Sequence, residues 1–184
     1  MRLTHDSPYN EWVKKRKLQE AGYIRNFIFG VEDSLVSTVG LLTGIAVGGV
    51  ARSQIVLTGI ILLLVEAFSM AVGSLLSEQS AEEYLKNREV SMRPAAMDSL
   101  IMFLSYFLAG LVPLSPYFVM ESAPALPVSI ALSLTALFLL GVISGTVFRI
   151  NIVKNGLRTL MMGGIAILVG IIASLVLSSF SPSA

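Results

Sequence analysis

Long apolar runs separated by short polar segments make up most of this chain. Each run has roughly the 20 residues that an α-helix needs to cross the hydrocarbon core of a bilayer. A segment inside a bilayer must satisfy its own backbone hydrogen bonds, which favours helices. The predicted spans are residues 27–50, 55–76, 95–114, 128–148 and 160–180. The pattern therefore predicts an all-α integral membrane protein with five transmembrane helices.

Composition supports this interpretation and removes several classes of function. Of the 184 residues, 54% are hydrophobic and 14% are charged, whereas a soluble domain has about a quarter of its residues charged. The chain has no cysteine, which excludes disulfides, thiolate metal sites and catalytic thiols. The net charge of +1 gives no indication of a nucleic-acid partner. Membrane lipid is the expected surrounding.

Lysine and arginine residues are distributed unevenly between the two sides of the predicted bundle. Only Arg52 falls on one side. The other side holds Arg2, Lys14, Lys15, Arg16, Lys17, Arg25, Lys86, Arg88, Arg93, Arg149, Lys154 and Arg158. The positive-inside rule makes this richer side cytoplasmic. We therefore expect a cytoplasmic N-terminus and a C-terminus outside.

The same pattern divides the chain into two parts. Residues 1–26 are predicted to form a cytoplasmic amphipathic segment, and residues 27–180 a single five-helix transmembrane domain. The basic cluster at residues 14–17 can contact anionic lipid headgroups or serve as a topology signal on a solvated helix face.

Carboxylates inside an apolar span are costly and usually functional. Glu66 lies near the middle of the second span, one helical turn before Met70, so an oxygen and a sulfur can point into the same space. A thioether favours softer cations than Mg²⁺. The alternatives are a methionine that fills a gap in the core and a glutamate bonded to a serine or a backbone carbonyl.

The first span carries a second group of polar residues. Glu32 and Asp33 lie about two turns from its cytoplasmic end, and Asn26 precedes Asp33 by seven residues on the same helical face. Gly40 and Gly44 continue this stripe and let another helix approach closely. We expect a polar entrance at the cytoplasmic end of this span. Beyond it we expect a packing surface against which a second copy of the chain can pack.

The segment after the second span contains further carboxylates. On a continued helix, Glu78, Glu82 and Glu89 share one face. They are candidates for gathering a metal ion. Ordinary solvation is the alternative, because Glu82 and Lys86 form a common i,i+4 pair.

Two stretches of sequence resemble the vacuolar iron transporter family. They are "RNFIFGVEDSLVSTVGLLTG" (residues 25–44) and "EAFSMAVGSLLSEQSAEEY" (residues 66–84). The residues that match the family pattern are Arg25, Gly30, Asp33, Val36, Ser37, Ser69, Met70 and Gly73. Two departures stand out. Asn26 occupies the place of the family's usual aspartate, and the short segment 77–93 replaces the long metal-binding insert of many relatives.

The resemblance implies a homodimeric carrier of divalent metal. Its substrate would be Fe²⁺, with Mn²⁺ as a second candidate, moved out of the cytosol in exchange for protons along a path at the dimer interface. The metal is then the substrate, and no cofactor is expected. The implied location is the cell membrane of a prokaryote or a vacuolar-type membrane of a eukaryote. Asp98 and Tyr106 in the third span can face the same path.

Other classes of function compete with this interpretation. A non-transporting membrane scaffold or a metal-sensing membrane protein is the main alternative, because the long insert is absent. A membrane-embedded aspartyl hydrolase would use Asp33 and Asp98 as an opposed pair, but the glycine-flanked signatures of such enzymes are missing. The only histidine, His5, lies in the polar tail. We therefore expect a protein that is not an enzyme.

Overall fold

The computed structural model describes residues 8–180, and all of its regular structure is helical. Five long helices each contain a window apolar enough to cross a membrane. These helices are α1 (Pro8–Val47), α2 (Arg52–Lys86), α3 (Arg93–Leu114), α5 (Ser122–Val147) and α6 (Ile152–Phe180). The short helix α4 (Pro116–Val119) joins α3 to α5. The predicted all-α fold with five candidate membrane spans is confirmed.

Several helices extend past the apolar runs that predicted them. Residues 8–26 continue into the first span as one unbroken helix, while residues 1–7 lie outside the described residues. The second helix runs beyond residue 76 to Lys86, where Asn87 adopts a left-handed conformation with φ 49°. Likewise, α5 and α6 begin before residues 128 and 160. Hydrophobicity marks the part of a helix that suits lipid, whereas hydrogen bonding continues the helix into water.

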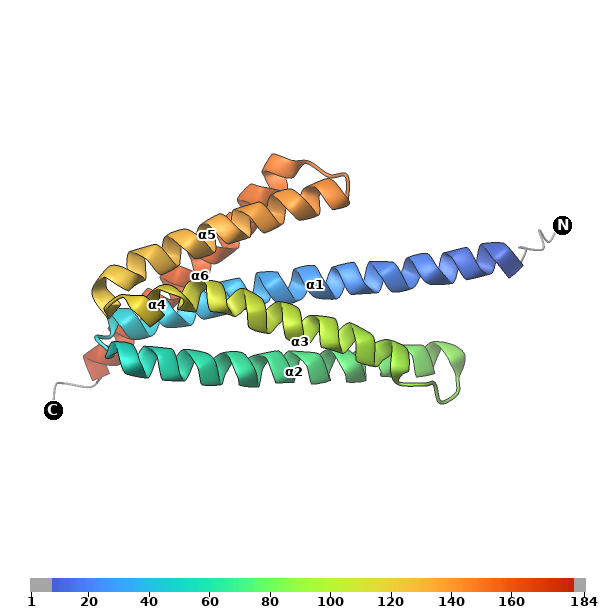
Figure 1. Cartoon of the computed structure of the whole chain (residues 1–184), viewed down its shortest axis with the longest axis horizontal. Coiled ribbons are helices and arrows are strands. Elements are labelled where there is room, and N and C mark those ends of the chain that lie inside the picture. Colours follow the sequence, from blue (N-terminus) through green and yellow to red (C-terminus); the bar gives the residue numbers. More distant parts are fainter. Residues whose placement is uncertain (1–7, 181–184) are drawn as a thin grey trace.

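The first helix is the centre of the bundle. It contacts α2, α3, α5 and α6, and Figure 1 shows it running through the middle of the molecule. The connection between α2 and α3 lies at the same end as the N-terminal part of α1, and α4 lies at the opposite end (Figure 1). The main apolar cluster is buried between α1, α2, α3, α4 and the start of α5, and it includes Leu42, Leu63, Tyr106 and Tyr117.

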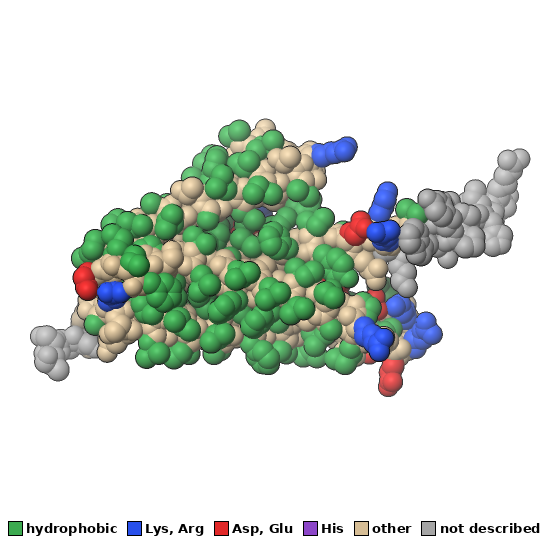
Figure 2. All heavy atoms as spheres, in the orientation of Figure 1, with side chains coloured by type: hydrophobic (Ala, Val, Ile, Leu, Met, Phe, Trp, Pro, Cys, Tyr) green, Lys and Arg blue, Asp and Glu red, His purple; other side chains and the backbone are tan. Residues whose placement is uncertain are grey.

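Apolar side chains cover the outside of the bundle along most of its length. Figure 2 shows hydrophobic side chains over the middle of the visible face, with charged side chains gathered towards the helix ends. On α2 the exposed apolar residues include Leu57, Ile61, Leu64 and Phe68. Large exposed apolar surfaces are unfavourable in water. This distribution suits contact with lipid.

The small residues of α1 pack against α6 of the same chain. A Cβ atom added to Gly44 would lie 2.9 Å from the carbonyl oxygen of Gly170, and one added to Gly40 would lie 2.9 Å from that of Ala166. The two backbones therefore approach too closely for side chains between them. The packing surface expected from Gly40 and Gly44 is thus occupied within the chain.

This close approach predicts a large difference between two glycines of α6. In Gly170→Ala the new methyl group would lie 2.1 Å from the carbonyl oxygen of Gly40, so we expect the free energy of unfolding to fall by about 1–3 kcal/mol. Gly164→Ala is the matched control, since an added Cβ meets no atom within 4 Å there. Unfolding of both variants in detergent measures the difference. Equal stability of the two variants would show that α1 and α6 are not in this close contact.

Candidate functional site

Helices α1, α2 and α3 bring polar side chains together at two levels of the bundle. One group, the deep layer, consists of Ser37, Glu66 and Tyr106. The other, the outer layer, consists of Arg25, Asn26, Ser74, Glu78 and Asp98. Since a helix rises about 1.5 Å per residue, the sequence separations place the two layers roughly 12–18 Å apart. Each layer takes at least one side chain from each of the three helices.

The deep layer holds Glu66 in the middle of the apolar α2. The Tyr106 hydroxyl of α3 donates a hydrogen bond to Glu66 Oε2. The Ser37 hydroxyl of α1 lies 3.4 Å from the same oxygen and 2.8 Å from the Tyr106 hydroxyl. Ser34, one turn before Ser37, donates a 2.6 Å hydrogen bond to the backbone carbonyl of Tyr106. A carboxylate in an apolar segment thus receives two hydroxyl partners from neighbouring helices.

Other predicted site residues surround this layer. Asp33 is half-buried and lies close enough to Glu66 for their charges to interact. Glu32, next to it on α1, is also half-buried. Met70 follows Glu66 by one turn and packs against the main apolar cluster. Two carboxylates and one thioether therefore belong to the same region of the bundle.

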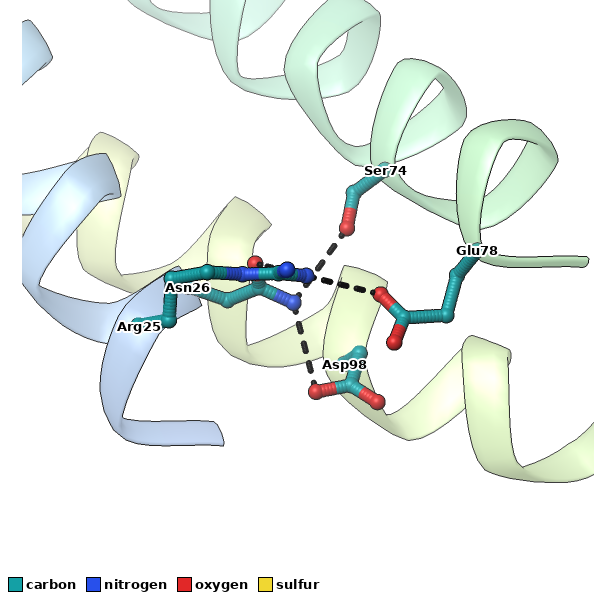
Figure 3. Close-up of polar contacts among 5 residues, drawn as sticks. All are labelled: Arg25, Asn26, Ser74, Glu78 and Asp98. Carbon is teal, nitrogen blue, oxygen red and sulfur yellow. Dashed lines mark hydrogen bonds and ion pairs between the residues drawn. The ribbon is translucent and has the colours of Figure 1, made fainter. Parts of the chain in front are cut away.

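The outer layer is built around Asn26. Its amide nitrogen lies 3.2 Å from Asp98 Oδ1 and 3.4 Å from the Ser74 hydroxyl, so α1 is bonded to both α3 and α2 (Figure 3). Asn26 is 3% exposed and Asp98 is 6% exposed. Beside them, Arg25 forms a 3.0 Å ion pair with Glu78. The predicted stripe residue Asn26 therefore acts in this structure as a hydrogen-bond donor.

A cavity of about 430 Å³ adjoins the outer layer. Its lining includes Gly22, Glu78, Glu82 and Asp98 together with Lys86. Gly22 on α1 and Glu82 on α2 lie nearer to the end of the bundle than Asn26 and Ser74 do, and on α3 the lining also includes Pro94 and Ala95, which precede Asp98. The outer layer consequently lies between this acidic cavity and the deep layer.

The structure divides the predicted metal-binding residues instead of gathering them. Asn26 and Glu78 belong to the outer layer, and Glu32, Asp33, Glu66 and Met70 to the region of the deep layer. Among the side chains that the structure describes, no three His, Cys, Asp or Glu residues lie close enough together to hold a metal ion. Within the described part of a single chain, at most two carboxylates therefore lie close enough together to bind one cation.

One predicted arrangement is wrong. We expected Glu78, Glu82 and Glu89 to share a helical face, but α2 ends at Lys86 and the left-handed Asn87 turns the chain away. Glu89 is therefore exposed in the connection to α3. Glu82 remains on the helix and pairs with Lys86 at 2.9 Å.

Several residues in the two layers were not among the predicted ligands. Ser74 follows Glu66 by eight residues on α2, and Tyr106 follows Asp98 by eight residues on α3. Residues eight positions apart lie on roughly the same face of a helix. This spacing could have indicated that Ser74 faces the same side as Glu66, and Tyr106 the same side as Asp98. The sequence did not indicate which helices would face one another.

Comparison with known proteins identifies the family. The model of the VIT family matches residues 24–98 and 88–174, which include both layers. The chain belongs to the VIT family, the vacuolar iron transporter family. The VIT-family match and the five apolar helices make it a multi-pass membrane protein.

Individual relatives of this VIT-family chain come from plants and an archaeon. It is 29% identical over 162 residues to vacuolar iron transporter homolog 4 of Arabidopsis thaliana, covering 80% of each chain. It is 39% identical over 75 residues to vacuolar iron transporter 1 of Tulipa gesneriana, covering 40% of this chain and 30% of the relative. An uncharacterized protein of Methanocaldococcus jannaschii is 25% identical over 161 residues.

The deep layer predicts unequal effects for two buried tyrosines. Tyr106→Phe removes the hydroxyl that donates to Glu66, so we expect the free energy of unfolding to fall by about 1–3 kcal/mol. Tyr117→Phe is the matched control. The Tyr117 hydroxyl is buried and has no hydrogen-bond partner among the described residues, so its removal should cost little. Unfolding in detergent compares the two, and a larger loss for Tyr117→Phe would contradict the assignment.

Proposed function

We propose that this protein carries divalent iron across a membrane, out of the cytosol, with manganese as a second substrate. Membership of the VIT family and the names of the plant relatives support iron as the substrate. The uneven distribution of lysine and arginine supports an inward-facing N-terminus. The membrane is the cell membrane in a prokaryote and a vacuolar-type membrane in a eukaryote.

The observation that carries the proposal is the position of Glu66. A carboxylate in the middle of an apolar helix is expensive to keep, and this one is bonded to Tyr106 and Ser37 from two other helices. In the proposed mechanism Glu66 binds the cation as a carboxylate beside Asp33. When the cation leaves, a proton replaces it, because an isolated negative charge is costly in an apolar environment. Metal transport is thereby coupled to proton exchange.

The neighbouring methionine supports the choice of metal. Mg²⁺ and Ca²⁺ prefer oxygen ligands alone, whereas a thioether contributes more to the binding of softer cations. Met70 is one turn from Glu66 on the same helix. We propose that a rotation of its flexible side chain adds sulfur to the ligands of Fe²⁺. The carboxylates of Glu78 and Glu82, which line the cavity, would serve metal capture on the cytoplasmic side.

We propose a homodimer with the path at its interface. One chain offers two interacting carboxylates near the deep layer, Asp33 and Glu66, while divalent cations usually take more protein ligands or water. A second copy related by a two-fold axis would double this number. Two weak half-sites that combine around a transient cation suit a carrier, which must release what it binds.

No observation favours the alternative functions over transport. For a hydrolase, Asp33 and Asp98 would have to face each other. Instead, Asp98 bonds to Asn26 in the outer layer and Asp33 interacts with Glu66. A scaffold needs no costly carboxylate in the middle of a span. Metal flux into liposomes separates a carrier from these classes.

The proposed role of Glu66 predicts a specific loss of transport. Glu66→Gln keeps the shape of the side chain and can still accept hydrogen bonds, but it removes the negative charge and the exchangeable proton. We expect the variant to fold as well as the parent, while Fe²⁺ transport falls by at least about 10- to 100-fold, the loss that follows removal of an outer-shell partner alone. Flux into liposomes that contain a metal-quenched dye measures this.

Glu121→Gln provides the matched control. Glu121 is exposed at the opposite end of the bundle, where it pairs with Arg52 at 3.7 Å, and its replacement should leave transport unchanged. Near-normal Fe²⁺ flux through a well-folded Glu66→Gln protein would exclude Glu66 from the path.

A further inference from the structure

We propose that the outer layer is a closed gate between the acidic cavity and the deep layer. This inference rests on the proposed transport function and adds the step that admits the cation. Asn26 holds α2 and α3 against α1 when the gate is closed. The gate opens when Asn26 releases Ser74 and Asp98 and Arg25 releases Glu78.

The geometry of Asn26 makes it suitable for this role. Its amide nitrogen is bonded to one side chain on each of two helices, at 3.2 Å to Asp98 and 3.4 Å to Ser74. Figure 3 shows both hydrogen bonds ending at the side-chain nitrogen of Asn26. Neither α2 nor α3 can separate from α1 at this level without breaking one of these bonds. Asn26 itself is almost completely buried, so its side chain blocks the space between the helices.

The ion pair beside Asn26 adds a contact that is easily broken. The Arg25 side chain is 66% exposed and that of Glu78 is 30% exposed, and exposed ion pairs contribute little to stability. Glu78 and Asp98 also line the cavity. A cation that enters the cavity therefore meets the two carboxylates whose partners, Arg25 and Asn26, close the gate. Attraction of the cation to these carboxylates weakens their bonds to α1.

The side chain at position 26 determines how easily the gate opens. An asparagine donates a hydrogen bond to the Asp98 carboxylate, whereas an aspartate at the same place would bring two carboxylates to hydrogen-bond distance. Like charges repel at this separation. Asn26→Ala removes both bonds, and Asn26→Asp replaces attraction by repulsion. Both substitutions should favour the open gate, and Asn26→Asp should do so more strongly.

Thiol labelling tests the gate directly, because the chain has no native cysteine. Ser37→Cys places a single thiol in the deep layer with the smallest change in side-chain size. A membrane-impermeant thiol reagent is added on the side of the connection between α2 and α3, to vesicles of known protein orientation. We expect Asn26→Ala to increase the labelling rate roughly fivefold or more, because opening then breaks fewer hydrogen bonds.

Asn155→Ala is the matched control. Asn155 also donates two side-chain hydrogen bonds, to the carbonyl of Gly141 and the hydroxyl of Ser144, but it joins α5 to α6. Its loss should leave labelling of Ser37→Cys unchanged. Equal labelling rates in Asn26→Ala and Asn155→Ala would overturn the gate.

Two further variants keep the test decisive if Asn26→Ala fails to fold. Ser74→Ala removes one hydrogen bond of the gate and Glu78→Ala removes its ion pair. Thermal unfolding checks that both variants are folded. Faster labelling in these variants supports the gate, and unchanged labelling in both overturns it. Labelling needs no metal, so its outcome is independent of whether the chain carries iron. A protein that labels as expected but moves no metal would contradict the proposed function alone.

Discussion

A carboxylate in the middle of an apolar helix is the constraint on which the arrangement of α1, α2 and α3 depends. Glu66 can be kept there only with polar partners, because each unsatisfied polar group costs several kcal/mol in hydrocarbon. The partners are Tyr106 and Ser37, and Ser34 in turn binds the backbone of Tyr106. These contacts fix the rotation of three helices about their axes. The same rotation brings Asn26, Ser74 and Asp98 together at the outer layer.

The remaining helices stabilise this arrangement from the other side of α1. The close backbone contact of Gly40 and Gly44 with α6 leaves little freedom for α1 to rotate or slide. In the proposed transport cycle α1 is therefore the fixed element, and α2 and α3 move relative to it at the outer layer. The order of features along the bundle, from cavity to outer layer to deep layer, then describes the entry of a cation. Arg52, bonded to the carbonyls of Tyr117 and Phe118, ties α2 to α4 at the opposite end.

The sequence predicted the helices and the costly carboxylates, but it did not show which residues would form hydrogen bonds to Glu66. Hydropathy and length identify a span because each transmembrane helix must by itself be long and apolar enough to cross the hydrocarbon core. Glu66 and Asp33 were noticeable because charge is rare in such a segment. Tyr106 was harder to recognise, since a tyrosine suits an apolar span without any polar partner. Its role depends on which face of α3 meets α2, and that is decided by packing among several helices. Glu89 was misplaced because one left-handed residue, Asn87, ends α2 before it.

The central claim is that this chain moves iron along a path that contains the Glu66 carboxylate. The most direct measurement is metal uptake by liposomes that contain the purified native protein, with Fe²⁺, Mn²⁺, Zn²⁺ and Mg²⁺ compared with and without a proton gradient. The account predicts uptake of Fe²⁺ and weaker or no uptake of Mg²⁺. Fe²⁺ uptake should accelerate when the lumen is acidic and slow when an ionophore removes the gradient. Fe²⁺ uptake no faster than in protein-free liposomes, under either condition, would contradict it.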